Sequence, residues 1–359
     1  MDFQVTEEQR MIADTVDEAL TELCQSETLR EQIEQHNMFD AGRWQALSDL
    51  GLPSALLPEN AGGVGLDDVA FCAIARAAGA ALLPEPLIES AGVALPLLVE
   101  MRDSAVDKVS LPQDFDMSVT ELTKGMGHAV LVHPLRPFAP HADTACQIIV
   151  AEDNVLWVGK PENFTLKAHE TIDPLTTLFS VNPHDATRVP LSEEGLAALA
   201  KAIDRATLFT AAQLAGIASA AQQLAVTYAT ERQQFGRSIG ANQAIKHLLA
   251  EVEVEAAFLA PVIIAAAALL PRQNVLGRGH LANARLRAAW VAGMACQSAV
   301  QVHGAMGYAW ETDVHLLLKR AMVLSTQWGD DERLFNHAAD RTFDAGQMPG
   351  PGTLFEAAI

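Results

Sequence analysis

Two short segments of this chain place polar residues and glycines where helices are expected to end. Residues 229–240 read ATERQQFGRSIG and precede Gln243, at the expected start of the next helix. Arg232 offers a permanent cation whose planar fork suits a phosphate, Phe235 offers a flat apolar face, and Gln243 offers an amide. The same residues also suit an ordinary helix end, with an arginine near the negative terminus and a glycine stop. The residues alone leave both interpretations open.

The second segment, residues 301–311, reads QVHGAMGYAWE. Its glycines let backbone amides approach a ligand closely, and the Gln301 amide can bond an adenine edge or a pyrophosphate oxygen. The alternative is an ordinary glycine turn between two helices. Taken singly, each segment fits either a binding site or a plain connection.

Other catalytic classes lack their usual residues. The 11 histidines include no H-E-x-x-H pair, so no metal site is predicted. The four cysteines, Cys24, Cys72, Cys146 and Cys296, lie far apart without a C-x-x-C spacing and are expected to be reduced, mostly buried thiols. A G-x-S-x-G nucleophile elbow is also absent.

Composition limits the partners that these segments could serve. The chain has 359 residues, half of them hydrophobic, and 24 Lys+Arg against 45 Asp+Glu give a formal charge of −21. Such a charge repels phosphate backbones and anionic lipid surfaces, so neither a nucleic acid nor a membrane is an expected partner. The first residues show no basic region followed by an apolar run, which predicts a cytoplasmic protein. The apolar run 256–270 is too short to span a bilayer and is predicted to be a buried core helix.

The elements that must position the two segments follow an α, β, α order. Residues 1–110 are predicted to form a helical domain, 111–191 a small, truncated antiparallel β domain, and 192–345 an antiparallel helical bundle, with an irregular tail at 346–359. Apolar stripes at helical spacing, such as Leu214, Ile217 and Leu224, mark the bundle helices. A capping-box pattern at residues 6–9 predicts a helix start there, and another helix is predicted from Asp67 or Asp68. Short β-rich runs predict strands at 129–133, 147–151, 155–158, 164–168 and 178–181. The predicted fold class is therefore mainly α with a small central antiparallel β domain.

In this order, the motifs resemble the acyl-CoA dehydrogenase family of flavoproteins. The resemblance covers nearly the whole chain, through residues 2–9, the loop 57–66, Ala142-Asp143, Arg-x-x-Phe-Gly at 232–236 and Gln-x-x-Gly at 301–304. It implies an acyl-CoA dehydrogenase-like α-β-α architecture and an FAD shared between two subunits. In such enzymes a glutamate removes the α-proton of an acyl-CoA while the β-hydride passes to the flavin. The residues it assigns to the FAD of a neighbouring subunit are Arg232, Phe235, Gly236, Gln243, Gln301 and Gly304.

The chain also departs from the family pattern at the chemical centre. Between Leu98 and Val132 it has neither the Thr-Glu-Pro and Gly-Ser-Asp loop nor the Trp-Ile-Thr strand that hold the flavin ring. Trp328 stands at the usual position of the glutamate base, and an indole cannot abstract a proton. The other helix position from which some members supply a base aligns near Leu259 and Ala260, which also lack a carboxylate.

Two carboxylates near Trp328 are alternatives for a base displaced from its usual position. Asp330 and Asp331 lie two and three residues after Trp328, although acidic residues there also suit the first turn of a following helix. No catalytic residue is therefore assigned to this chain, with Asp330 and Asp331 as the alternatives.

Keeping the cross-subunit FAD motifs while lacking the flavin-ring loop and the base resembles the short, non-catalytic subunits of heteromeric acyl-CoA dehydrogenases of bacterial steroid degradation. This resemblance implies FAD as cofactor and an α2β2 assembly with a homologous catalytic subunit that holds the acyl-CoA. An electron-transfer flavoprotein or a similar acceptor would take the electrons. The alternatives are a self-sufficient homo-oligomer with a displaced carboxylate base and a non-enzymatic assembly scaffold.

Overall fold

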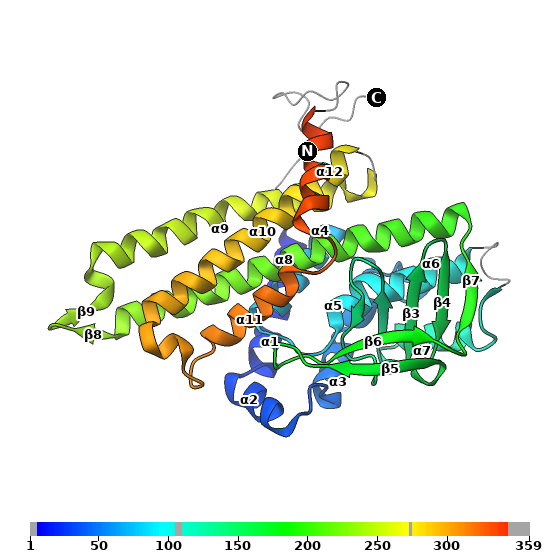
Figure 1. Ribbon diagram of the computed structural model, residues 1–359, viewed down its shortest axis with the longest axis horizontal. Coiled ribbons are helices and arrows are strands. Elements are labelled where there is room, and N and C mark those ends of the chain that lie inside the picture. Colours follow the sequence, from blue (N-terminus) through cyan, green and yellow to red (C-terminus); the bar gives the residue numbers. More distant parts are fainter. Residues whose placement is uncertain (1–5, 105–109, 273–274, 344–359) are drawn as a thin grey trace. The chain divides into compact units, whose positions relative to one another are not determined.

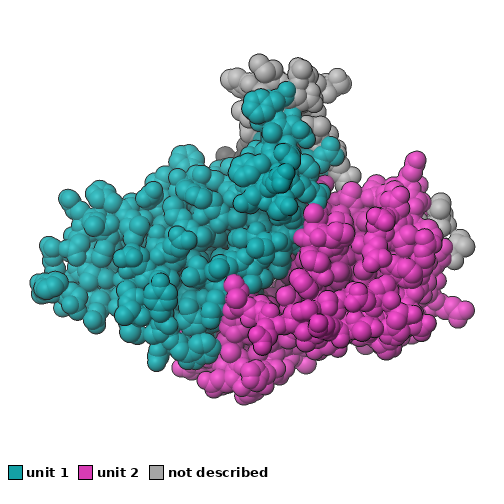
Figure 2. All heavy atoms as spheres, in the orientation of Figure 1, with its two compact units in different colours: residues 1–26, 72–82, 207–359 teal, residues 27–71, 83–206 magenta. Residues whose placement is uncertain are grey.

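The computed structural model describes residues 6–104, 110–272 and 275–343 (Figure 1). Over these residues the chain is mainly helical with a small β region, as the sequence predicts. The fold divides into two compact units, residues 1–26, 72–82 and 207–359 as unit 1 and residues 27–71 and 83–206 as unit 2 (Figure 2). Each unit thus combines segments distant in sequence. The predicted division at 110, 191 and 345 stays a prediction, and the tail 346–359 lies outside the described residues.

The first third of the described chain is helical. A capping box starts the first helix, where Thr6 Oγ1 accepts from the Gln9 amide at 3.1 Å and Gln9 Oε1 accepts from the Thr6 amide at 3.0 Å. This geometry confirms the helix start predicted from the sequence. The helices are α1 (Glu7–Leu23), α2 (Ser26–Gln35), α3 (Ala41–Asp49), α4 (Asp68–Ala80), α5 (Leu87–Glu89), α6 (Leu95–Asp103) and α7 (Phe115–Thr123), with a π-helical turn, Ser90–Ala94, between α5 and α6.

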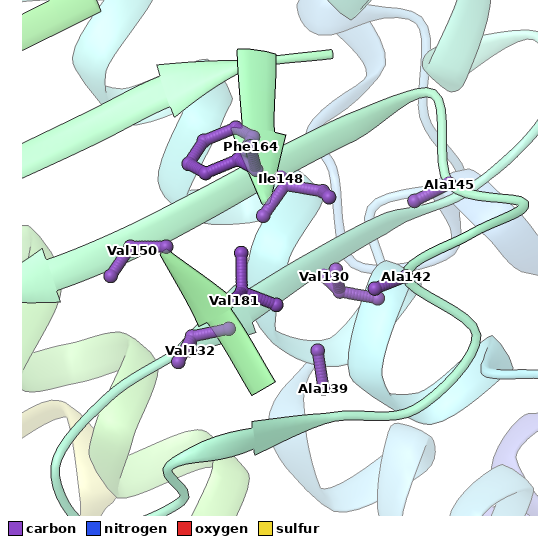
Figure 3. Close-up of a cluster of buried hydrophobic side chains, with 9 residues drawn as sticks. All are labelled: Val130, Val132, Ala139, Ala142, Ala145, Ile148, Val150, Phe164 and Val181. Atoms are coloured by element: carbon purple, nitrogen blue, oxygen red, sulfur yellow. The ribbon is translucent and has the colours of Figure 1, made fainter. Parts of the chain in front are cut away.

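Unit 2 contains the β region, built as two small sheets. The strands are β1 (Ala129–Val132), β2 (Phe138–Ala139), β3 (Gln147–Glu152), β4 (Val155–Gly159), β5 (Phe164–His169), β6 (Leu178–Pro183) and β7 (Thr187–Pro190). One sheet has the order β1-β3-β4-β7 and the other β2-β6-β5. Buried side chains from both sheets, among them Val130, Ile148, Phe164 and Val181, form one apolar cluster (Figure 3). Apolar burial is therefore what holds the two sheets together.

The β domain is antiparallel, as predicted, except at one pair of strands. β1 and β3 pair in parallel, with Ala129 opposite Gln147, whereas β3–β4, β4–β7, β2–β6 and β5–β6 are antiparallel. Residues 133–146 connect β1 to β3 and contribute β2 to the other sheet. Because the chain leaves the first sheet and crosses back before β3 begins, β3 enters in the same direction as β1. The region is a mixed sheet packed against an antiparallel one.

Unit 1 is a bundle of long helices. It consists mainly of the later part of α8 (Glu193–Glu231) with α9 (Gln243–Leu269), α10 (Val275–His303), α11 (Val314–Ser325) and α12 (Asp331–Phe343). α10 packs against α9, α11 and α12. Glycines permit a close crossing of α4 and α8, since a Cβ on Gly216 would lie 1.9 Å from the Arg76 carbonyl oxygen and one on Gly79 would lie 2.1 Å from that of Gln213. The two helix backbones therefore touch at this crossing.

The apolar run 256–270 is not a fully buried core helix, and that prediction is wrong. Leu259 and Ile263 in this run are buried, whereas the Phe258 side chain is 66% exposed. Val254, one helical turn before Phe258 on α9, is 52% exposed as well. Burial on one side of α9 leaves its other apolar side at the surface of the single chain. Among the described residues, α9 is the one helix whose length and composition would allow it to cross a membrane. Core helices can have the same length and composition.

Candidate cofactor-binding site

The first predicted segment forms a tight hairpin between α8 and α9 (Figure 1). β8 (Gln233–Gln234) pairs with β9 (Arg237–Ser238), and Phe235 and Gly236 form the two-residue turn. Both turn residues have positive φ angles, 52° and 79°, which is the backbone that such hairpin turns require. Gly236 adopts it without strain, and Phe235 does so with its ring fully exposed. The apolar face of Phe235 is therefore left uncovered by the residues of this chain that the structure describes.

Backbone hydrogen bonds connect Arg232 to α8 and to η6 (Ile239–Ala241), the short 3-10 turn before α9. The Arg232 amide donates to the Tyr228 carbonyl oxygen at 2.9 Å, and the Arg232 carbonyl oxygen accepts from the Ile239 amide at 2.8 Å. The exposed guanidinium of Arg232 has no hydrogen bond or ion pair within the part of the chain that the structure describes. Gln243, the first residue of α9, is also exposed. Both side chains are thus available to another molecule.

The guanidinium of Arg237, in the same hairpin, is hydrogen-bonded within the chain, unlike that of Arg232. Arg237 Nη2 donates to Asn242 Oδ1 at 2.6 Å, and Asn242 Nδ2 donates to the Ile239 carbonyl oxygen at 3.0 Å. Arg237 is therefore engaged in closing the connection to α9, whereas Arg232 is not.

The second predicted segment lies where α10 ends and passes into a short 3-10 helix, η8 (Gly304–Tyr308). Gln301 and Gly304 are exposed, and Gly304 has a φ of 59°. A Cβ added to Gly304 would meet nothing within 4 Å, so the backbone angle rather than space favours glycine there. By contrast, a Cβ on Gly307 would lie 2.9 Å from the Val300 carbonyl oxygen, which lets η8 fold back closely on α10.

A pair of stacked aromatic rings joins the two segments. The rings of Tyr228 on α8 and His303 on α10 have centroids 4.2 Å apart and an interplanar angle of 22°. His303 is 8% exposed, and its Nδ1 donates to the Ala299 carbonyl oxygen at 2.8 Å. The stack brings the end of α8 beside the end of α10 within unit 1. The sequence placed Tyr228 in the apolar stripe of its helix but indicated no role in the site for either ring, although Tyr228 lies one helical turn before Arg232.

The residues gathered here fit the dinucleotide that the motifs imply. All six residues assigned to a cofactor are exposed: Arg232, Phe235, Gly236, Gln243, Gln301 and Gly304. A guanidinium with no partner in the described chain suits a diphosphate, amides suit phosphate or adenine edges, and an exposed ring offers an apolar face. On the chemistry of these donors, FAD fits this end of unit 1.

The turn at the expected base position is closed. Trp328 is 4% exposed, has a φ of 62°, and its carbonyl oxygen accepts from Thr207 Oγ1 at 3.4 Å. The alternative position holds Leu259, which is buried, and Ala260, which is exposed. None of these side chains can act as a general base.

The nearby carboxylates belong to the start of α12. Asp330 Oδ1 accepts from the Arg333 amide at 2.8 Å, so this carboxylate caps the helix. Asp331 is exposed in the first turn, where a negative charge is favourable. Asp330 therefore caps the helix, which is the alternative to a catalytic role that the sequence allowed.

A buried arginine fixes the same turn from the inside. Arg285 Nη2 donates to the carbonyl oxygens of Leu324 at 2.6 Å and of Gln327 at 3.1 Å. Burial lowers the pKa of Arg285 to about 10, an effect that the charge of Asp331 opposes, and the guanidinium stays protonated at neutral pH. Sequence patterns did not point to Arg285, since its interior position depends on how α10 and α11 pack.

The cysteines match the predicted thiols. Cys24, Cys72 and Cys296 are buried and Cys146 is half-buried, all outside disulfide bonds. Burial raises the pKa of the Cys296 thiol to about 12 and raises that of Cys146 as well. These thiols are protonated and poorly reactive at neutral pH.

Comparison with known proteins agrees with the motifs. Family models match both ends of the chain: the N-terminal domain of acyl-CoA dehydrogenases at residues 6–101 and their C-terminal domain at residues 193–343. The acyl-CoA dehydrogenase IpdE2 of Mycobacterium tuberculosis is 29% identical over 319 residues, which cover 88% of this chain and 91% of that protein.

Solved structures share the fold. The ChsE4-ChsE5 complex from Mycobacterium tuberculosis has a TM-score of 0.82 at 20% identity, covering 98% of this chain and 100% of the matched chain. A steroid acyl-CoA dehydrogenase, the Tcur3481-Tcur3483 G363A variant, has a TM-score of 0.80 at 20% identity, covering 93 and 97%. The family's members are FAD-binding flavoproteins. With matching domain models on both sides of the β region and the same fold throughout, this chain belongs to the acyl-CoA dehydrogenase family.

Proposed function

We propose that this chain is a subunit of an FAD-dependent acyl-CoA dehydrogenase and completes the FAD site of a homologous catalytic subunit in an α2β2 assembly. The assembly would form an α,β double bond in an acyl-CoA thioester. The observation that carries the proposal is a contrast within unit 1: the six cofactor residues are exposed, whereas the base position is a buried tryptophan.

The residues of this chain would bind rather than react. Arg232 would place its fork on a diphosphate, because its guanidinium is exposed and has no partner in the described chain. Gln243 and Gln301 would donate or accept through their amides, and Phe235 would cover an apolar face of the bound molecule. FAD, when bound, supplies the hydride acceptor of the reaction.

A base on the partner subunit would remove the α-proton of the acyl-CoA. Trp328 has no basic atom, and the Asp330 carboxylate is already used in capping α12. Asp331 remains exposed and would be the base of the second candidate, a self-sufficient homo-oligomer. The capped Asp330 and the buried Trp328 favour a partner's base over this alternative. An assembly scaffold without a cofactor would give no role to the exposed side chain of Arg232.

The exposed apolar side of α9 supports an assembly. Val254 and Phe258 on α9 are more than half exposed, and Trp290 on α10 is 49% exposed beneath the Arg287 guanidinium, which lies 4.5 Å from its ring centroid. Val254 and Phe258 are four residues apart and so lie on one face of α9, and contiguous exposed apolar side chains of this kind mark interaction surfaces. One fold neighbour is the ChsE4-ChsE5 complex from Mycobacterium tuberculosis, an assembly of two different chains.

The substrate and the acceptor follow from the same resemblance. A thioester of a bulky steroid-derived acid is the proposed substrate class, since a fold neighbour is described as a steroid acyl-CoA dehydrogenase. The acyl-CoA would lie in the partner's site, an electron-transfer flavoprotein or similar protein would take the electrons, and the assembly would be cytoplasmic.

Anaerobic flavin bleaching tests this function. The purified full chain is mixed with FAD and a panel of acyl-CoA thioesters, and the flavin absorbance is followed. Loss of a general base alone costs about 10²- to 10⁴-fold in rate, so we expect no rapid bleaching without the partner and rapid bleaching with it. Rapid bleaching by the chain alone would contradict the proposal, and Asp330→Asn and Asp331→Asn would then identify the base.

A further inference from the structure

The stacked rings of Tyr228 and His303 join two segments that the proposed function uses together. Their centroid separation of 4.2 Å and angle of 22° describe a tight stack between α8 and α10. Other bonds near this end, such as that from Gln222 Nε2 to the Leu249 carbonyl oxygen at 2.8 Å, connect α8 to α9 instead. The stack is therefore a direct link between α8, which ends one residue before Arg232, and α10, which carries Gln301.

Each ring is tightly coupled to a proposed cofactor residue. The Arg232 amide donates to the Tyr228 carbonyl oxygen at 2.9 Å, so the two residues occupy successive turns at the end of α8. His303 lies between Gln301 and Gly304, and its bond from Nδ1 to the Ala299 carbonyl oxygen at 2.8 Å fixes the ring against α10. A shift of either ring would move the adjoining segment.

We infer that Tyr228 and His303 form a positioning pair that sets the spacing between Arg232 and the turn 301–304, so that both segments reach one FAD diphosphate and its adenosine. This inference rests on the proposed function. A dinucleotide held from two helices gains affinity when the spacing is set before it binds, because less conformational freedom is then lost. Neither ring needs to touch the cofactor for this role.

A matched pair of substitutions separates the stack from simple bulk. Tyr228→Phe keeps the ring, whereas Tyr228→Leu keeps apolar volume and removes the ring. The assembly is purified from its host through a tag on the full chain, its flavin is removed, and FAD affinity is measured by titration. Aromatic pairs are worth enough for a loss of about 3- to 10-fold on removal, so we expect that loss for Tyr228→Leu and near-normal affinity for Tyr228→Phe.

A double substitution shows whether the stack acts through Arg232. In the Arg232→Ala background, Tyr228→Leu should cost much less than it does alone, because the group that it positions is gone. An equal, additive loss in both backgrounds would overturn the positioning role. His303→Leu, tested in the same way, replaces Tyr228→Leu if that variant does not fold.

Hydrogen exchange on the full chain tests the positioning without flavin. Amides of residues 299–308 should exchange faster in Tyr228→Leu than in Tyr228→Phe, and unchanged exchange would overturn the inference. The two proposals fail differently. If Arg232→Ala leaves FAD affinity unchanged, the proposed function is wrong. If Arg232→Ala weakens FAD binding while Tyr228→Leu does not, only the positioning pair is wrong.

Discussion

Two helix ends in unit 1 use similar residues in opposite ways. At the end of α8, the Arg232 guanidinium, the Phe235 ring and the following Gln243 amide are exposed. At the end of α11, the Arg285 guanidinium is buried against backbone carbonyls, and the Trp328 side chain is buried as well. An arginine and an aromatic residue are therefore exposed at one helix end and buried in the chain's own fold at the other.

The difference follows from how each end satisfies its backbone. A helix leaves its last carbonyl groups without partners in the helix, and at α11 the Arg285 guanidinium supplies donors to two carbonyl oxygens of the last turn and the turn beyond it. At α8 the hairpin itself supplies the bonds, as in the bond from the Ile239 amide to the Arg232 carbonyl oxygen. The Arg232 side chain thus takes no part in closing this helix end and stays exposed. In a protein of this family, the base would be expected at the other end, that of α11, where Trp328 is buried.

The largest effect on the free energy of unfolding should come from replacing Arg285, which is buried at the end of α11. We expect Arg285→Met to lower the free energy of unfolding by about 2–4 kcal/mol, because two carbonyl oxygens lose their buried charged donor. Urea denaturation of the full chain measures this change. Arg287, two residues along α10, is partly exposed and paired with Glu255, so Arg287→Met is the matched control and should cost less than about 1 kcal/mol. If both variants lose the same free energy of unfolding, the buried Arg285 stabilises the fold no more than the partly exposed Arg287 does.

The exposed end should show the reverse pattern. We expect Arg232→Ala to change the free energy of unfolding by less than about 0.5 kcal/mol, since its side chain supports nothing in the described chain. FAD affinity of the assembly should fall by about 10- to 100-fold, the worth of charge-assisted hydrogen bonds, when measured by titration of the deflavinated protein. Arg232→Lys should recover only part of this loss, because lysine lacks the fork.

Arg237 provides the control for charge at this end. Arg237→Ala removes the same charge from the same hairpin, but this guanidinium is bonded to Asn242. We expect a smaller loss of FAD affinity than for Arg232→Ala. A loss of the same size would mean that the hairpin attracts FAD through its general charge rather than through a specific contact of Arg232.

Much of the fold was predictable because it depends on local patterns. The capping box at Thr6, the helix from Asp68 and the apolar stripe of α8 through Leu214 and Ile217 each act within a few turns of one helix. The β-rich runs likewise predicted five strands close to their observed bounds. β2 and β7 escaped detection because one has two residues and the other is a short edge strand containing Arg188.

What the sequence could not predict depends on pairing between distant segments. The parallel pairing of β1 with β3 is set by where the chain travels between them, which composition does not encode. The burial of Arg285 and the stack of Tyr228 on His303 arise only when α10 packs against its neighbours. For the candidate site, motifs located the exposed residues, while the elements that position them emerged from the fold. The cofactor roles of these residues stay predictions.

Flavin counting on the intact assembly tests the central claim most directly. The full chain, tagged and purified from its host, is analysed by light scattering, by mass spectrometry of co-purified chains and by FAD absorbance per chain. We predict a heterotetramer with a longer homologous subunit that carries the glutamate base, holding two FAD per four chains. A monodisperse monomer, or a homotetramer with one FAD per chain, would contradict the account.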